Sequence, residues 1–460
     1  MITLKELKSY SRVSLYEKFI SSSCISKKIN LDEILNILLK KNIINYDLNG
    51  NIKFNYVGFI LVKDIFIFVK PKYIIDKNQE DSMIVNDIFE LFKKFNQKEI
   101  VYLDNMNDLE IESDIVDNIL LSLIRFLLDD YIENGFYRKE MVSYELNGDG
   151  DIDWDLTIDE INPLIIGKKS IYSDFITEES IIDNNMFLTK IHSCIINECI
   201  SILNRTGLNN IFKYDIEENG SILDDIEDKN YIFYKIDNEI NIQFIDKKIR
   251  VLKAMKLYLK KRAEFQEKQI LLYGTRNFKW IWEVLCCHVF ENEFIKDYNN
   301  SKYEKYSISS PEWIIYGSKI NIFRENRNRL TPDILKIINY KNKKYLLILD
   351  AKYYNIKIEQ NNIKGNPGIR DISKQYLYCT MLNKYIESEG IDKKNIINAF
   401  LFPTDLDNYL QGEVKLDFME KFYENPIYLF KINVHEVINM YCNNKTYNLI
   451  NLLENIFNFN

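Results

Sequence analysis

The sequence lacks the residue patterns that mark zinc sites, disulfide frameworks and nucleotide-binding loops. Its seven cysteines include no CxxC pair, and its three histidines form no metal-ligand spacing with them, which argues against both zinc and disulfide-bonded domains. Neither GxxxxGK[ST] nor GxGxxG occurs, so we expect no P-loop. The chain has no apolar run of about 18 residues and no signal-peptide core after Met1. We therefore expect a cytoplasmic protein with no membrane span.

Length and hydrophobic patterning predict several packed domains. The 460 residues are 46% hydrophobic, and a chain of this length forms roughly two to four domains. Residues 56–62 and 65–73 have the composition of a β-hairpin, and helical spacing surrounds them. The expected fold class is α/β (α+β overall), with a mixed helix and small-sheet region before a C-terminal domain. We place a helical and β-hairpin domain at 1–138, a middle domain at 139–265 and the last domain at 266–460.

Two further segments carry specific expectations. Residues 1–46 have the spacing of short helices, and Asn30 is positioned to cap one of them. The segment 147–158 is rich in Asp and Gly, as calcium loops are. Counting from Asp149, however, Trp154 stands where an EF-hand loop needs glycine. We expect a turn that leads into a strand there.

Two short apolar runs near residue 340 carry the strongest chemical signal. The runs Ile334–Ile338 and Tyr345–Leu349 are separated by a polar stretch that is typical of a hairpin turn. Asp350 and Lys352 are two residues apart at the end of the second run, so their side chains point to the same face of the strand. If residue 339 or 340 pairs with residue 344 or 345, Asp333 comes to lie opposite residues 350–352.

Two carboxylates and an ammonium at one end of a hairpin suit hydrolysis of a phosphodiester. Asp333 and Asp350 can hold Mg²⁺, a hard ion that prefers oxygen ligands, and Lys352 can orient or activate the attacking water. The alternative is an edge hairpin with solvated charges. Asp350 interrupts an apolar run, where a buried carboxylate is costly unless it is paired or binds a metal. Asp333 follows Pro332 at the first residue of a strand, where proline is tolerated. Both observations favour the metal site.

The order of elements around the hairpin resembles the PD-(D/E)xK nuclease core, which runs helix, hairpin, helix, strand. An apolar helix upstream carries Glu283, and a glutamate of the first helix often joins the metal site in that superfamily. The alternative for Glu283 is an ion pair with Lys279, four residues earlier. The helix that begins after Gly368 carries Gln375, which could reach a phosphate or the attacking water, or could be a solvated helix residue.

Charge is distributed unevenly along the chain. The formal net charge is −8, yet residues 319–375 contain thirteen Lys or Arg and only five Asp or Glu. Residues 145–160 contain seven acids and no base. Because phosphate contacts supply most non-specific affinity for DNA, a protein with little basic surface outside its active site should bind DNA weakly alone. A partner that delivers the DNA is the natural inference.

Several short motifs resemble the LlaJI-type restriction endonuclease family, whose members are similar to McrC. They are spread over residues 56–403 and thus cover most of the chain. The motifs are Val57–Ile60 with Pro71–Tyr73, Gly150–Ile158 with Pro163, Tyr273–Thr275 with Trp282–Glu283, and Asp371 with Lys374–Gln375.

The resemblance implies a phage-defence restriction subunit that cuts DNA together with a separately encoded McrB-like AAA+ GTPase, docked through the middle region. We take Asp333, Asp350, Lys352, Glu283 and Gln375 as the catalytic set, with Mg²⁺, or Mn²⁺ as a second candidate, at Asp333, Asp350 and Glu283. Nuclease domains could dimerise on DNA. Two alternatives stay open: a self-sufficient nuclease of repair or mobile-element processing, and an adaptor with an inactive nuclease fold. The intact Asp333, Asp350 and Lys352 argue against the adaptor.

Overall fold

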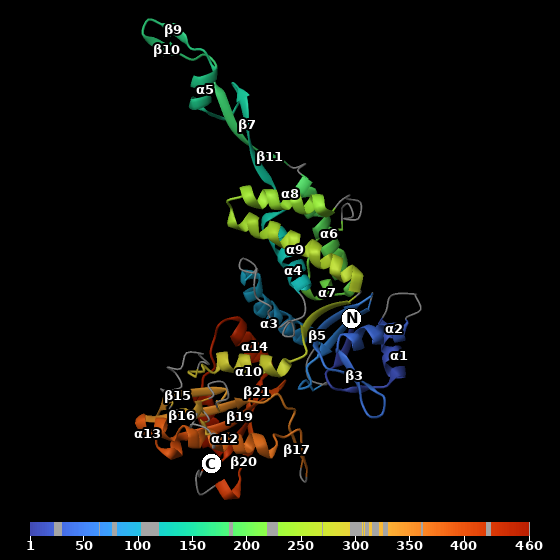
Figure 1. Cartoon of the computed structure of the whole chain (residues 1–460), viewed down its shortest axis with the longest axis vertical. Coiled ribbons are helices and arrows are strands. Elements are labelled where there is room, and N and C mark those ends of the chain that lie inside the picture. The colour runs from blue at the N-terminus through green and yellow to red at the C-terminus, as the bar shows by residue number, and fades with distance from the viewer. Residues whose placement is uncertain are drawn as a thin grey trace. The chain divides into compact units, whose positions relative to one another are not determined.

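The computed structural model describes most of the chain, and its fold is mixed α/β, as predicted (Figure 1). The residues described are 1–22, 30–63, 65–75, 81–102, 119–183, 187–218, 229–268, 270–294, 306, 308, 312–314, 322–324, 330–359, 362–419 and 425–459. They divide into two compact units: Met1–Asp117 with Leu272–Asn460, and Asn118–Leu271. The middle range 139–265 lies inside the second unit, while most of the first and last predicted ranges share the other. No helix in the described ranges is long and apolar enough to cross a membrane.

The N-terminal part of the first unit contains a four-stranded sheet in the order β1-β6-β5-β12. The predicted hairpin is confirmed, since β5 and β6 pair in antiparallel fashion. Short helices were expected throughout residues 1–46, but Ile2–Lys5 forms a strand, because its alternate residues Ile2 and Leu4 are buried. Asn30 caps α2 as predicted, accepting a hydrogen bond from Glu33 N. The elements are β1 (Ile2–Lys5), β2 (Ser9–Tyr10), α1 (Arg12–Ser22), α2 (Leu31–Lys40), β3 (Ile44–Tyr46), β4 (Ile52–Phe54), β5 (Val57–Val62), β6 (Ile65–Lys70), α3 (Asp81–Tyr102) and β12 (Ile270–Thr275).

Two glycines allow β5 and β12 to approach each other closely. A Cβ atom on Gly58, whose φ is +131°, would lie 2.3 Å from Tyr273 O. A Cβ atom on Gly274 would lie 2.2 Å from Val57 O. Both distances are too short for any side chain, so these strands can pair only through glycine. The contact gives a structural reason for the glycine in each of two motifs noted in the sequence, Val57–Ile60 and Tyr273–Thr275.

We predict that Gly274→Ala lowers the unfolding midpoint of the protein, because the added methyl group must push the two strands apart. The expected loss is on the order of 2 kcal/mol, the size usual for overpacking at a site that cannot relax. Thermal unfolding followed by circular dichroism measures it. Gly368→Ala is the matched control, since a Cβ atom there would meet nothing within 4 Å and its φ of −75° is open to alanine. Equal midpoints for Gly274→Ala and the wild type would contradict the prediction.

The C-terminal part of the first unit is built on a five-stranded sheet in the order β15-β16-β19-β21-β20. The central strands β16, β19 and β21 are parallel, and β15 and β20 pair with them in antiparallel fashion. Helix α10, hairpin β15–β16, helix α12 and strand β19 follow one another as predicted. The elements are α10 (Phe278–Val289), β13 (Glu312–Ile314), β14 (Ile322–Arg324), β15 (Ile334–Tyr340), β16 (Lys343–Ala351), β17 (Lys357–Glu359), β18 (Asn362–Lys364), α12 (Ile369–Met381), α13 (Asn383–Ser388), η2 (Lys393–Asn395), β19 (Ile396–Thr404), β20 (Tyr409–Val414), η3 (Asp417–Met419), β21 (Ile427–Asn433), α14 (Val434–Cys442) and α15 (Ile450–Phe459).

The second unit combines a group of packed helices with an extended region formed by residues 139–183, here called the β-ribbon (Figure 1). His192 is fully buried on α6 and accepts a hydrogen bond from Tyr137 N at 2.8 Å, so it is a core residue. The turn expected in residues 147–158 does lead into a strand, but this strand is only Asp151–Ile152, and a helix follows because Asp153 caps it through Leu156 N. The elements are α4 (Ile119–Asn134), β7 (Lys139–Leu146), β8 (Asp151–Ile152), α5 (Trp154–Glu160), β9 (Leu164–Ile166), β10 (Lys169–Ile171), β11 (Ile176–Asp183), α6 (Phe187–Thr206), α7 (Asn209–Phe212), α8 (Lys229–Ile242) and α9 (Asp246–Lys268).

Candidate active site

The register of the β15–β16 hairpin brings Asp333 to the end of the second strand. Residue 339 pairs with residue 344, one of the registers considered from the sequence, and Ile334 consequently pairs with Leu349. Asp333 is the next residue outward, and its Oδ2 accepts a hydrogen bond from Ala351 N at 3.0 Å. The predicted convergence of Asp333 with residues 350–352 is therefore present in the structure.

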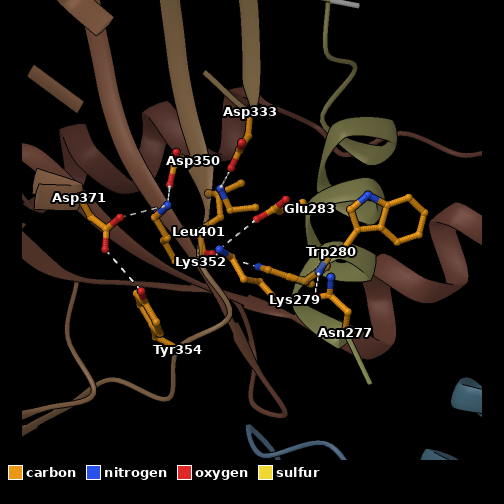
Figure 2. A network of polar contacts seen from close by, with 12 residues as sticks. Asn277, Lys279, Trp280, Glu283, Asp333, Asp350, Lys352, Tyr354, Asp371 and Leu401 are labelled. Carbon is orange, nitrogen blue, oxygen red and sulfur yellow. Dashed lines mark hydrogen bonds and ion pairs between the residues drawn. The ribbon is translucent and has the colours of Figure 1, made fainter. Parts of the chain in front are cut away.

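Asp350 and Lys352 project together from the end of β16, and Asp371 on α12 completes the group (Figure 2). Asp350 is 2% exposed and Lys352 is 7% exposed. Lys352 Nζ lies 2.6 Å from Asp350 Oδ2 and 3.6 Å from Asp371 Oδ1. Tyr354 OH donates a hydrogen bond to the other oxygen of Asp371 at 3.4 Å. One ammonium thus lies between two carboxylates, with Asp333 beside them.

Burial makes the negative charge of Asp350 unfavourable in the metal-free protein. Desolvation, and then the nearby charge of Asp333, raise the pKa of Asp350 to about 6, although Lys352 opposes the change. Burial lowers the pKa of Lys352, but the carboxylates of Asp350, Asp371 and Asp333 outweigh it and raise that pKa above its ordinary value. Lys352 is consequently protonated at neutral pH, and the two aspartates would gain from an additional cation.

The residues present fit a divalent cation held by two carboxylates and water. Asp350 Oδ2 is buried and lies 2.6 Å from Lys352 Nζ. An ionised carboxylate has about four acceptor sites on its two oxygens, which leaves capacity for a metal. In the parts of the chain that the structure describes, no group of three or more Asp, Glu, His or Cys is placed to hold one ion. Mg²⁺ commonly binds through one or two carboxylates and keeps several waters, so Asp333 and Asp350 are sufficient ligands for it.

Glu283 lies near this group without joining the two aspartates as a third ligand. It projects from α10 toward the site (Figure 2), its side chain is 29% exposed, and its Oε1 lies 3.8 Å from Lys279 Nζ. The ion pair is the alternative that the spacing of the two residues suggested. A metal-binding role for Glu283 stays a prediction.

Gln375 is not on the accessible surface of the site. It is fully buried on α12, and its Nε2 is 3.4 Å from Ala399 O on β19. In this arrangement its side chain packs between helix and sheet and cannot reach a phosphate directly. Its catalytic role stays a prediction that would require the side chain to move, and the solvated alternative is wrong.

Asn292 supports Asp333 and was not identified from the sequence. Its Nδ2 donates to Asp333 O at 2.9 Å, and its Oδ1 accepts from Leu335 N and Phe294 N, both at 2.9 Å. One side chain thus joins the segment after α10 to the start of β15. Asparagine is common in this sequence and no motif surrounds it, so no local signal distinguishes it.

A partly buried hydrogen-bond network connects the N-terminal residues to the strand end beside Lys352. Tyr353 OH donates to Glu6 Oε2 at 2.5 Å, and Lys72 N donates to the same oxygen at 3.0 Å. Asn355 Nδ2 donates to Lys72 O at 3.3 Å. Burial raises the pKa of Glu6 more than these hydrogen bonds lower it. The segment that follows Lys352 is therefore held by residues just beyond the ends of β1 and β6, two neighbouring parallel strands of the N-terminal sheet.

We predict that Asp350→Asn stabilises the metal-free protein at neutral pH. The pKa of Asp350 rises on folding from 3.8 to about 6, so its ionisation above about pH 4 favours the unfolded chain. Removing the charge should stabilise the fold by on the order of 2 kcal/mol near neutral pH, and the gain should vanish towards pH 4. Thermal unfolding in EDTA at both pH values measures this.

Asp371→Asn is the matched control for that experiment, because it removes a more exposed carboxylate from the same lysine. It should change the midpoint much less than Asp350→Asn at neutral pH. An Asp350→Asn protein that is less stable than the wild type at neutral pH would contradict the unfavourable burial of the Asp350 charge.

Two solved structures from Thermococcus gammatolerans align with this chain. One contains McrB AAA+ hexamers with bound McrC, and it aligns at 13% identity with a TM-score of 0.36, covering 96% of this chain and 99% of the other. The second, a McrBC complex, aligns at 14% identity with a TM-score of 0.24, covering 58% and 86%. TM-scores this low do not establish a common fold.

Sequence comparison identifies the family of this chain, which the two structural alignments do not. The model of the LlaJI restriction endonuclease family matches residues 56–444. The "Type II restriction enzyme BsuMI component YdjA" of Bacillus subtilis (strain 168) is 32% identical over 446 residues, which cover 93% of this chain and 88% of that protein. The extent of both matches shows that this chain belongs to the LlaJI restriction endonuclease family.

Proposed function

We propose that this chain is the DNA-cutting subunit of a restriction system and has a PD-(D/E)xK-type core that uses Mg²⁺, or Mn²⁺ in its place. The observation that carries the proposal is the convergence of Asp333, Asp350 and Lys352 at one end of the β15–β16 hairpin. Family membership supports hydrolysis of DNA as the reaction. The site's two carboxylates, with a protonated lysine beside them, suit that chemistry.

Each residue of the site has a distinct role in this proposal. Asp333 and Asp350 would hold the cation, and Asn292 keeps the backbone of Asp333 in place. A bound Mg²⁺ supplies positive charge at the scissile phosphate and lowers the pKa of water. Lys352 is protonated, so it donates a hydrogen bond to a phosphate oxygen or to the attacking water. One site of this kind cuts one strand, so a double-strand break would need two nuclease domains on the DNA.

We further propose that cleavage depends on a separately encoded McrB-like AAA+ GTPase. The chain has no P-loop of its own, and the segment 319–375, which contains Asp333, Asp350 and Lys352, has thirteen Lys or Arg against five Asp or Glu. The relative from Bacillus subtilis is named as one component of a restriction enzyme, which supports an assembly of several chains. A partner that binds DNA and hydrolyses GTP would supply what this chain lacks.

The β-ribbon of the second unit is the surface best suited to that partner. Apolar side chains along the ribbon and at its end are exposed, an arrangement that marks interaction sites on proteins. Ile165 is 75% exposed, and Trp154 on α5 is 52% exposed. The other exposed apolar residues there are Val142, Tyr144, Leu146, Ile152, Ile158, Leu164, Ile166 and Ile171. The seven acids of residues 145–160 make the same region a poor DNA surface.

We predict that Ile165→Asp weakens binding to the GTPase by at least about tenfold, the effect of losing one well-buried interface residue. The measurement is the concentration of this chain that gives half-maximal stimulation of GTP hydrolysis. Phe418→Asp is the matched control, because Phe418 is a similarly exposed apolar residue, 65% exposed, in the first unit. An unchanged half-maximal concentration for Ile165→Asp would exclude this position from the interface.

The cleavage assay combines plasmid DNA and Mg²⁺ with the purified chain, with and without the protein encoded beside it and GTP. We predict cleavage only when both proteins, GTP and Mg²⁺ are present. Asp350→Ala should reduce the rate by more than about 100-fold, since residues that only support metal ligands already cost about 10- to 100-fold. Glu413→Ala, which removes a surface carboxylate paired with Lys415, should cut like the wild type.

The outcomes separate the three functions considered from the sequence. Cleavage by the chain alone would identify a self-sufficient nuclease. Undiminished cleavage by Asp350→Ala would show that the site lies elsewhere. Absence of cleavage with the partner and either Mg²⁺ or Mn²⁺ would favour an adaptor with an inactive nuclease fold.

A further inference from the structure

The chain between Lys352 and Asp371 leaves the active site and returns to it. Lys352 and Tyr354, at the start of this segment, both contact the carboxylate of Asp371 at its end. Between them, β17 and β18 pair as a two-stranded ribbon, and within the described residues this ribbon joins no larger sheet. The label β17 marks it in Figure 1. A projecting ribbon is thus attached directly to the group that contains Lys352.

The base of the ribbon is closed by a tight backbone contact. Gly365 has a φ of +66°, and a Cβ atom there would lie 2.6 Å from Asn355 O, so only glycine allows the returning chain to pass the outgoing one. Ile356 is buried next to this crossing, and its carbonyl accepts from Lys431 Nζ at 3.3 Å. The side chain of Asn355 is held by its hydrogen bond to Lys72 O. The ribbon therefore starts from a fixed position relative to the site.

The ribbon carries positive charge that the described protein does not neutralise. Lys357 lies directly opposite Lys364 in the β17–β18 register, and both are exposed. Like charges opposite each other destabilise an antiparallel pair, and neither lysine forms an ion pair within the described residues. Arg370, also exposed, lies one residue before Asp371. Glu359 is the one acid between residues 353 and 370. A bound polyanion would relieve this repulsion.

We propose that the β17–β18 ribbon is a DNA-backbone contact, in which Lys357 and Lys364 bind phosphates of the strand that enters the active site. The inference rests on the proposed nuclease function and extends it to a particular surface. A protein partner is a weaker candidate for this ribbon, because two opposed lysines match the charge of a phosphate chain. Ile363 on β18 is 52% exposed, but the larger group of exposed apolar side chains lies on the β-ribbon of the second unit.

The ribbon is within reach of DNA held at the site. Lys357 is five residues beyond Lys352, so their Cα atoms are at most about 17 Å apart at roughly 3.4 Å per residue. Successive nucleotides of a B-DNA strand advance about 3.4 Å along the helix axis. Lys357 can therefore contact phosphates within about five nucleotides of the bond that is cut.

The test compares three double variants of the full chain, with the GTPase present as the cleavage assay requires. Lys357→Gln with Lys364→Gln removes the two cations, and Lys357→Arg with Lys364→Arg keeps them. Lys341→Gln with Lys343→Gln is the matched control, because it removes two exposed lysines from the opposite end of the β15–β16 hairpin. Binding of a labelled duplex is measured over a range of KCl concentrations, together with KM for DNA and kcat.

We expect the Lys357→Gln, Lys364→Gln protein to lose about two units of the slope of log K against log [KCl], one for each phosphate contact. Its KM should rise while kcat at saturating DNA stays unchanged, and the arginine variant should behave as the wild type. An unchanged slope and KM, or an equal loss in the Lys341→Gln, Lys343→Gln protein, would overturn the inference even if the wild type cuts DNA. If the wild type neither binds nor cuts DNA, the proposed function itself fails.

Discussion

The antiparallel register between β15 and β16 is the constraint on which the site depends. The side-chain period of a strand is two residues, so a shift by one would turn Asp350 and Lys352 to the opposite face. The register is held by burial, because Leu346–Leu349 are fully inaccessible and β16 also pairs in parallel with β19. Apolar packing thus keeps Asp350 at a position where its charge is unfavourable even beside Lys352. Carboxylates whose pKa is strongly perturbed by burial and neighbouring charges are typical of functional sites.

The site also depends on residues far away in the sequence. Asn292 connects the end of α10 to Asp333, and Glu6 connects the first strand of the chain to Tyr353. These contacts lie within one compact unit formed by both ends of the chain. The N-terminal sheet is accordingly part of the support of the active site. Truncating it would remove partners of the segment that immediately follows Lys352.

Local patterns predicted the parts of the structure that local forces determine. The two apolar runs and their polar turn identified β15 and β16, and the two-residue period placed Asp350 and Lys352 on one face. Asn292 and Glu6 could not be predicted, because their partners are 41 and 347 residues away. Gln375 was placed correctly on a helix, but its burial depends on β19. The strand expected after the turn near Asp149 is only two residues long, because the cap formed by Asp153 starts a helix at Trp154.

The central claim is that Asp333 and Asp350 hold a divalent cation beside Lys352. Crystals of the protein grown with Mn²⁺ test it most directly, because anomalous scattering locates the ion independently of any assumed mechanism. We predict an anomalous peak within coordinating distance of both carboxylates, about 2.0–2.2 Å from their oxygens for an ion of this size, and no such peak in the Asp350→Asn protein. A well-occupied Mn²⁺ ion elsewhere, with these two carboxylates unliganded, would contradict the claim.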